Sequence, residues 1–324
     1  MRPDVPEFSV VITCFNEEQS IGEFHARLRK TLDALDASSE IIMVNDGSAD
    51  DTWGRLVELH GRDPCLSIVN LFRNAGQAAA ITAAIQEAQG EHLVFIDSDL
   101  QLDPEELPEL VKSFREGHDV VNGIRRERKD PLRRRLPSLL ANLILRGVAG
   151  VPFTDFGCTF QVMHGGLVRA HGFGPYKCFN NVLVTRSAGR FAEVPVSHHP
   201  RRYGESGWTT LALWRYLMDN VVLYSQGLFQ FFSFVALAVA FLTLARIVLP
   251  IPGPLFGETN TGLLLNAMLL SSAAILAVVA FVGEYVLRSF SVHARGPLYV
   301  VRERRPARNR LSLGVVDARR GEAG

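Results

Sequence analysis

The chain has 324 residues, of which 47% are apolar and 21% charged, and its 34 basic and 34 acidic side chains give a formal net charge of zero. A general nucleic-acid-binding protein would carry a basic excess, so nucleic acid is not an expected partner. The charge is nevertheless segregated, because residues 1–119 carry 9 basic and 23 acidic side chains while residues 120–324 carry 25 and 11. The 4 cysteines form no C-x-x-C pair, so neither a zinc site nor a disulfide framework is indicated.

The first part of the chain alternates short apolar runs with helical patterns. This alternation predicts an α/β fold, with a mostly parallel, Rossmann-like sheet covered by helices on both faces. Ligands of such sheets bind at the carboxyl ends of the strands, so the residues after each run are the candidates for a site. The apolar runs cover residues 8–14, 41–44, 66–69 and 93–96, and the helical patterns cover residues 17–35, 76–88 and 104–115.

The sharpest local signal follows the fourth run, where residues 97–101 read D-S-D-L-Q. Asp97 and Asp99 can converge on a hard cation, because Mg²⁺ takes one or two carboxylates and completes its shell with substrate phosphates. Asp103 is expected to cap the next helix, with Pro104 at the first helical position. Isolated D-x-D strings are common, and the position of this one at a strand end is what favours a metal site.

Other strand ends supply polar residues of matching chemistry. Each alone could equally form a turn or a helix cap. Together they line one edge of one sheet with acids and amides, as a nucleoside diphosphate requires, whereas a dinucleotide fingerprint and a P-loop are both missing from the sequence. The segments are C-F-N-E-E at residues 14–18, N-D-G-S-A-D at residues 45–50 and R-N-A-G at residues 73–76.

The middle of the chain is basic and amphipathic. Seven basic side chains between residues 125 and 135 precede an apolar stretch, which predicts an interfacial helix over about residues 131–149. A second amphipathic helix is expected over residues 209–219. Apolar helices with basic flanks suit the surface of an anionic membrane, and an ordinary solvated charge run is the alternative.

Residues 220–245 and 259–283 contain no charged side chain. Each stretch can cross the roughly 30 Å hydrocarbon layer as a helix, so spans are predicted over about residues 220–247 and 259–283. The arginines that follow the second span place both termini in the cytoplasm by the positive-inside rule. We therefore expect a multi-pass protein of the inner (plasma) membrane whose first part lies in the cytoplasm, and two buried helices of a soluble core are the alternative.

Eight motifs in this order resemble the inverting GT-A glycosyltransferases of family 2, and within them the polyprenyl-phosphate glycosyltransferases, which include dolichol-phosphate mannose synthase and bacterial undecaprenyl-phosphate glucosyltransferases. The resemblance implies a GT-A domain over residues 1–208, a membrane region over residues 220–284 and an Arg-rich cytoplasmic tail over residues 285–324. The motifs are S-V-V-I-T-C-F-N-E-E, V-N-D-G-S-A-D-D-T, R-N-A-G-Q-A-A-A, I-D-S-D-L-Q-L-D-P-E, V-V-N-G-I-R-R-E-R, T-D-F-G-C-T-F-Q-V-M, A-E-V-P-V and H-P-R-R-Y-G-E-S-G-W.

The same resemblance implies transfer of a hexose, with inversion, from a UDP- or GDP-linked donor to a membrane polyprenyl phosphate, with Mg²⁺ or Mn²⁺ as cofactor. Asp155 and Asp99 would be catalytic, and Asp155 would act either as a weak general base or as an orienting group. The metal would be held by Asp97, Asp99 and Gln101. The nucleotide sugar would be bound by Thr13, Phe15, Glu17, Asn45, Asp46, Asn74, Gly76, Asp97 and Ser98, and the acceptor phosphate by Arg125, Arg128, Arg201, Arg202 and Ser206.

Three positions depart from the family pattern. Thr13 stands where Pro is frequent, Asn45 where an Asp is usual, and Gly207 where a Lys is usual, which removes a cation near the acceptor. Two other functions remain open. A processive polysaccharide synthase would need a Q-x-x-R-W motif, which the string at residues 213–216 does not complete, and a catalytically silent membrane scaffold is the third hypothesis. Relatives with such hairpins can form homo-oligomers, and self-association is a further expectation.

Overall fold

The computed structural model describes residues 5–125, 150–151, 154–155, 157–200, 202 and 296–308, together with isolated helical residues between 268 and 286. The chain divides into two compact units. The first comprises residues 1–146, 150–208 and 296–324, and the second comprises residues 147–149 and 209–295. The predicted amphipathic helices at residues 131–149 and 209–219 lie outside the described residues.

An eight-stranded sheet forms the centre of the first unit, in the order β7-β5-β6-β4-β1-β2-β3-β8. The four predicted strands are β1 to β4, and they pair in parallel, whereas β6 and β8 run antiparallel to their neighbours and make the sheet mixed. β5 and β7 form a further parallel pair. The strands are β1 Phe8–Cys14, β2 Ser39–Asn45, β3 Leu66–Leu71, β4 His92–Asp97, β5 Val120–Arg125, β6 Gln161–His164, β7 Phe191–Val196 and β8 Val301–Arg305.

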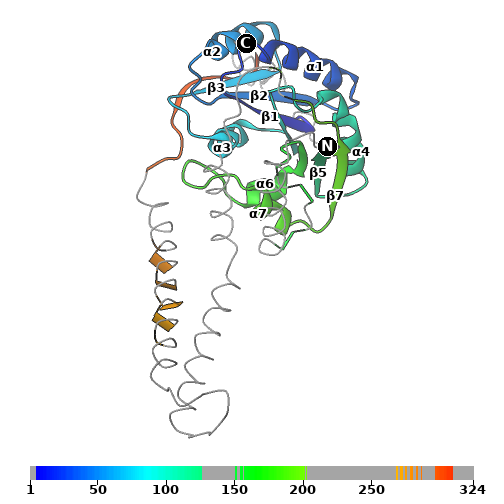
Figure 1. Ribbon diagram of the computed structural model, residues 1–324. Helices are drawn as coiled ribbons and strands as arrows, with labels where there is room; N and C mark the ends of the chain where they lie inside the picture. The colour runs from blue at the N-terminus through cyan, green and yellow to red at the C-terminus, as the bar shows by residue number, and fades with distance from the viewer. Residues whose placement is uncertain are drawn as a thin grey trace, which may run out of the picture. The chain divides into compact units, whose positions relative to one another are not determined.

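Helices cover both faces of the sheet, as predicted, with α1, α2 and α4 on one side and α3, α6 and α7 on the other (Figure 1). The predicted helix at residues 104–115 is a short 3-10 turn that continues into α4. The helices are α1 Ile21–Ala34, α2 Thr52–Arg62, α3 Gln77–Glu87, the 3-10 helix Pro104–Glu106, α4 Leu107–Arg115, α6 Gly165–Ala170 and α7 Asn181–Arg186.

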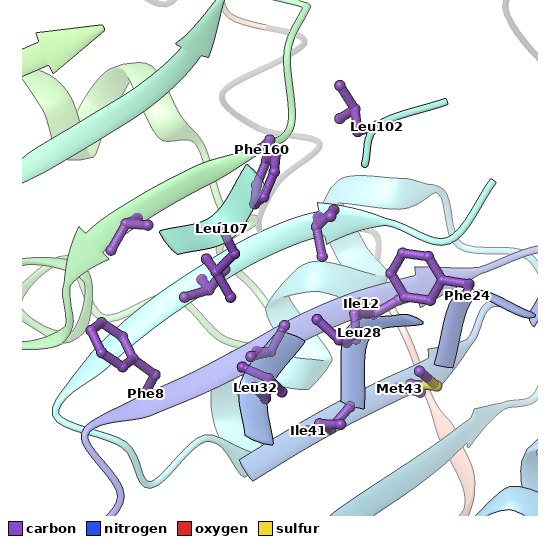
Figure 2. Packing of buried hydrophobic residues seen from close by; sticks show 14 of the residues in the cluster. Phe8, Ile12, Phe24, Leu28, Leu32, Ile41, Met43, Leu102, Leu107 and Phe160 are labelled. Atoms are coloured by element: carbon purple, nitrogen blue, oxygen red, sulfur yellow. The ribbon is translucent and has the colours of Figure 1, made fainter. Parts of the chain in front are cut away.

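Alternation along β1 divides the core into two layers. Phe8, Val10 and Ile12 face α1, whose Phe24 and Leu28 pack against them, and Figure 2 shows this cluster. The intervening side chains face α3, where alanines allow that helix to approach the sheet closely. Because both faces of β1 are fully covered, the central strands form a rigid base for the loops that follow them.

The strand β8 comes from the segment that the sequence predicted as an Arg-rich tail, and no strand was predicted there. It extends the sheet beyond β3, and Tyr299, just before it, is buried in the α3 layer. Arg302 lies over the ring of Phe72 at 5.8 Å, and Arg304 Nε lies 3.2 Å from a carboxylate oxygen of Glu87. Arg302 and Arg304 therefore help to hold β8 in place.

In the second unit, the described residues between 268 and 286 are helical. Five of their large apolar side chains are exposed, namely Met268, Ile275, Val279, Val282 and Val286. Within the described parts of the chain, no helix is both long and apolar enough to cross a membrane. The predicted span at residues 220–247, and most of the span at residues 259–283, lie outside those parts.

Candidate active site

The carboxyl ends of β1, β2 and β4 meet at one edge of the sheet. Cys14 lies opposite Asn45 on β2, and Thr13 lies opposite Asp97 on β4. The predicted strand-end segments are therefore neighbours in space, as the parallel arrangement implied. The site is built from the loops that leave this edge.

Asp46, directly after β2, fixes the loop that leads into α3. Its two carboxylate oxygens accept hydrogen bonds from the main-chain N–H groups of Ala75 at 2.7 Å and Gly76 at 3.0 Å. Burial raises the pKa of the Asp46 carboxyl, although these two N–H groups act in the opposite direction. Gly47 has φ +62°, and a Cβ atom there would lie 2.3 Å from the carbonyl carbon of Arg73, so this crossing of two loops requires glycine.

Asn45 is buried, and its amide is bonded on both sides. Its Nδ2 donates to Asn70 Oδ1 at 2.9 Å, and its Oδ1 accepts from the main-chain N–H of Ser48 at 3.3 Å. An ionised aspartate could accept but could not donate to Asn70. Asn45, which stands where the family usually has an aspartate, therefore makes a hydrogen bond to Asn70 on β3 that an aspartate could not make.

The loop after β1 is joined to the loop after β2 by reciprocal bonds. The N–H of Asn16 donates to Ser48 Oγ at 3.0 Å, and Asn16 Oδ1 accepts from the N–H of Ala49 at 2.9 Å. Asn16 has φ +56°, a left-handed conformation that asparagine tolerates. The carboxylate of Glu17 is buried and accepts a hydrogen bond from Ser20, while Phe15 at the same edge is 46% exposed.

Asp97, the last residue of β4, is oriented by two neutral donors. Gln77 Nε2, at the start of α3, donates to its Oδ1, and Thr159 Oγ1 donates to its Oδ2, each at 2.7 Å. Sequence reasoning missed both residues, although each lies in or beside a motif already noted. Two segments distant in the sequence therefore converge on this carboxylate.

Asp99 lies in the turn that follows β4. Its Oδ1 accepts from the N–H of Gln101 at 3.1 Å, and Ser98 Oγ donates to the carbonyl of Thr13 at 2.9 Å. Leu100, between Asp99 and Gln101, has φ +59°, a conformation that costs a leucine about 1–2 kcal/mol. Its buried side chain holds the turn in place.

Two buried thiols lie among the acids of the site. Burial raises the pKa of Cys158 to about 12, and the nearby charges of Asp155 and Asp97 add to the rise while Arg125 opposes it. Burial likewise raises the pKa of Cys14 to about 12, a hydrogen bond with Ser98 acts against this, and Glu17 and Asp97 add to it. Asp97, Arg125 and Asp155 therefore lie close enough to Cys158 for their charges to act on its thiol.

Asp155 and Arg125 form a buried ion pair. Arg125 Nε lies 2.7 Å from Asp155 Oδ2, and Arg125 Nη2 lies 2.7 Å from Oδ1. The sequence assigned these residues separate roles, and the structure joins them.

The other predicted residues are placed less centrally. Gly76 contributes its N–H to Asp46, Asn74 is exposed, and Arg202 Nη1 lies 3.3 Å from Glu23 Oε1 on the outside of α1. Gln101 Nε2 donates to the carbonyl of His199 at 3.3 Å. Arg128, Arg201, Ser206 and Gly207 lie outside the described residues.

The prediction that Asp103 is the N-cap residue, with Pro104 at the start of the helix, is confirmed in position. Asp103 occupies the cap position, but its side chain makes no capping bond. Its carboxylate pairs instead with Arg27 Nη2 at 2.6 Å and His199 Nε2 at 2.7 Å. The Arg27 guanidinium from α1 and the His199 ring from the segment after β7 therefore occupy the carboxylate in place of the local N–H groups.

Acids, amides and a basic residue at the carboxyl edge of a covered α/β sheet define a class of proteins that bind anionic, nucleotide-like ligands. A family model described as "Glycosyl transferase family 2" matches residues 9–174. The chain belongs to glycosyltransferase family 2. The predicted recognition of this family, and of an enzyme that transfers a glycosyl group, is confirmed.

Curated relatives match nearly the whole chain. The undecaprenyl-phosphate 4-deoxy-4-formamido-L-arabinose transferase of Pseudomonas paraeruginosa (strain DSM 24068 / PA7) is 33% identical, over 94% of this chain and 92% of the relative. The protein of the same name from Shewanella sediminis (strain HAW-EB3) is 30% identical, over 90% and 91%. The predicted likeness to polyprenyl-phosphate glycosyltransferases is thereby confirmed.

A solved structure shares the fold of the first unit. Glucosyl-3-phosphoglycerate synthase from Mycobacterium tuberculosis, in complex with Mn²⁺, UDP and glucosyl-3-phosphoglycerate, superposes with a TM-score of 0.52 at 20% identity, over 68% of this chain and 80% of that chain. This likeness supports the predicted GT-A-like α/β fold.

Proposed function

We propose that this protein transfers a sugar from a UDP-linked donor to the phosphate of a membrane polyprenol, with inversion at the anomeric carbon. The observation that carries the proposal is the end of β4, where Asp97 and Asp99 follow one another and Asp97 accepts a hydrogen bond from Thr159, four residues after the Asp155 that pairs with Arg125. The relatives named for undecaprenyl phosphate support the acceptor. The UDP in the solved structure of the same fold supports the nucleotide.

The carboxylates Asp97 and Asp99 fit a divalent cation of the Mg²⁺ or Mn²⁺ type. Gln77 Nε2 and Thr159 Oγ1 each donate to one oxygen of Asp97 and fix the orientation of its carboxylate. No three His, Cys, Asp or Glu side chains in the described residues could form a metal site by themselves. Two carboxylates suit a cation that takes its other ligands from a diphosphate and water, and such a cation would stabilise the charge of the departing diphosphate.

The remaining residues bind and orient the donor. Asp46 holds the 73–76 loop, and the bonds between the loops after β1 and β2 set the shape of the edge where the nucleoside would lie. Phe15 offers an exposed ring for stacking. In the proposed role, Arg125 contacts the acceptor phosphate, together with the predicted Arg128, Arg201, Arg202 and Ser206.

The uncharged stretches at residues 220–245 and 259–283 support an anchor in the inner membrane, with the catalytic unit in the cytoplasm. A lipid-linked acceptor requires this location. The predicted donor sugar is a hexose, whereas the relatives' names specify a substituted arabinose, which is a pentose.

The test is to incubate the purified full chain with Mg²⁺, a short polyprenyl phosphate and a panel of labelled donors. The panel contains UDP- and GDP-hexoses and UDP-4-deoxy-4-formamido-L-arabinose. Extraction of a labelled polyprenyl-phosphate sugar, with inverted anomeric configuration, is the expected result. Elongation of that product by further sugars would support the processive alternative. Absence of product with every donor would overturn the proposal.

A further inference from the structure

We propose that Asp155 is a positioning residue that fixes the guanidinium of Arg125, and that it takes no proton during sugar transfer. This inference rests on the proposed function and deepens it. Both Asp155 oxygens accept from Arg125, at 2.7 Å each, and Oδ1 also accepts from the N–H of Gly157 at 3.1 Å. The Arg125 side chain is 15% exposed and the Asp155 side chain 7%, so the pair is largely withdrawn from solvent.

The main chain around the pair is shaped to admit the guanidinium. A Cβ atom on Gly157 would lie 2.6 Å from Arg125 Nη2, well inside contact distance. The glycine that follows Asp155 by two positions therefore leaves space for the guanidinium of Arg125. Glycine is needed at position 157 for space and not for its backbone freedom, because the φ of Gly157 lies outside the left-handed region.

The turn that carries Asp155 is held from both sides. Thr154 donates through its N–H and its Oγ1 to the two carboxylate oxygens of Glu193 on β7, each at 2.7 Å. Asn122 on β5 donates to the Asp155 carbonyl at 3.4 Å and accepts from Gln161 at 2.8 Å. Arg125 is the last residue of the same β5 strand. The hydrogen bonds of Thr154 and Asn122 thus fix the positions of Asp155 and Arg125 relative to each other before any substrate binds.

This geometry makes Asp155 a poor proton acceptor. A cation bonded to both oxygens stabilises the ionised form, so protonation would break a bidentate pair. The reaction does not need a base, because a phosphate monoester with a second pKa near 6 is mostly dianionic at neutral pH. An acceptor phosphate oxygen bonds to the anomeric carbon, the bond from that carbon to the diphosphate oxygen breaks, and its electron pair leaves with the nucleoside diphosphate. No proton is transferred in this step.

The experiment is a double-variant cycle with Asp155→Asn, Arg125→Gln and the pair together, assayed in the full chain with the donor that wild type uses. We expect Asp155→Asn to lower kcat/KM for the acceptor about 10- to 100-fold, as for loss of an interaction with a charged group. In the Arg125→Gln background the same change should cost less than about threefold, because its partner is already gone. The acid limb of the rate profile should stay near pH 6 in every variant, since it belongs to the acceptor phosphate.

Two further variants keep the inference testable if Asp155→Asn folds poorly. Gly157→Ala leaves both partners in place but displaces the guanidinium, so it should reproduce the acceptor defect. Arg115→Gln is the matched control, because Arg115 makes a similar two-oxygen pair with Glu7, at 2.9 and 3.1 Å, remote from the site. Its acceptor kinetics should match wild type.

Fully additive losses in the cycle, or an acid limb that disappears only when Asp155 is replaced, would show that Asp155 acts as a base and would overturn the inference. Failure of the proposed function is recognised separately. In that case wild type itself yields no lipid-linked sugar, and the cycle is not reached.

Discussion

Strand β2 has a buried carboxylate at each end, Glu40 near its start and Asp46 directly after it. Glu40 Oε1 accepts from Ser9 Oγ at 2.6 Å and from the N–H groups of Gln89 at 2.6 Å and Gly90 at 3.2 Å. Asp46 accepts from the N–H groups of Ala75 and Gly76. Each acid thus gathers main-chain donors from a distant segment and ties that segment to β2.

The two acids differ in which edge of the parallel strands they occupy. Glu40 is at the amino edge, where it closes the turn before β4, and a Cβ atom on Gly90 would lie 2.5 Å from the main-chain nitrogen of Ser9. Asp46 is at the carboxyl edge, where loops of parallel strands converge on ligands. The same interaction therefore stabilises the fold at one end of β2 and shapes the proposed donor site at the other. Four substitutions, taken from the largest expected effect to the smallest, test this comparison.

Asp99→Asn should have the largest effect on activity. The amide keeps an oxygen to accept from the N–H of Gln101 but loses the negative charge proposed to hold the cation. We expect the rate of sugar transfer to fall about 10²- to 10³-fold, as when one electrostatic stabiliser of a transition state is lost. The melting temperature should change little. Steady-state rates over a range of Mg²⁺ concentrations provide the measurement, and near-normal turnover at ordinary Mg²⁺ would remove Asp99 from the proposed metal site.

Asp46→Asn should impair binding and stability together. The asparagine keeps one acceptor oxygen and turns an NH₂ group toward a loop N–H. Loss of a buried bond to a charged group corresponds to about 1–3 kcal/mol, so KM for the donor should rise about 10-fold or more and the unfolding midpoint should fall. Donor titrations and urea unfolding give the two readouts. An unchanged KM would mean that the 73–76 loop does not contribute to donor binding.

Glu40→Gln is the counterpart at the other edge. It removes the same kind of buried carboxylate, and the free energy of unfolding should fall by about 1–3 kcal/mol. Because no substrate is proposed near Ser9 or Gly90, kcat and KM should stay within about twofold of wild type at a temperature where the variant is folded. A selective loss of activity would contradict the assignment of this edge to stability.

The sequence predicted the central strands and the acids of the carboxyl edge, but not the partners of those acids. Strands β1 to β4 and the convergence of Asn45, Asp46 and Asp97 followed from apolar periodicity and from the parallel arrangement, because both are local signals. The partners of those acids did not follow, since Gln77 and Thr159 reach Asp97 from distant segments. Arg125 and Asp155 lie 30 positions apart in the sequence, and their pairing depends on the clearance at Gly157. β8 was missed because its alternation with arginine resembles a solvated tail until Phe72, Trp53 and Glu87 are placed beside it.

The smallest expected effect is a pH dependence of stability from His92 at the amino edge. Its ring packs against Phe8, Phe114 and His164, with ring centroids 5.7, 4.7 and 4.9 Å away. In the described part of the chain, its Nδ1 is buried without a hydrogen-bond partner. Burial lowers the pKa of His92, and the neighbouring His164 adds to the shift, while Glu91 and Glu7 oppose it.

A histidine whose pKa is lower in the folded state binds fewer protons there than in the unfolded chain, whose histidines titrate near 6.5. Stability should therefore be fully present above about pH 6.5 and should decline as the pH falls through that value and toward the folded pKa. His92→Phe, which suits the aromatic surroundings, should flatten this slope and leave sugar transfer unchanged. Urea midpoints of wild type and variant between pH 5 and pH 8 measure the slopes. If the two slopes coincide, the amino edge contributes to stability through Glu40 but not through His92.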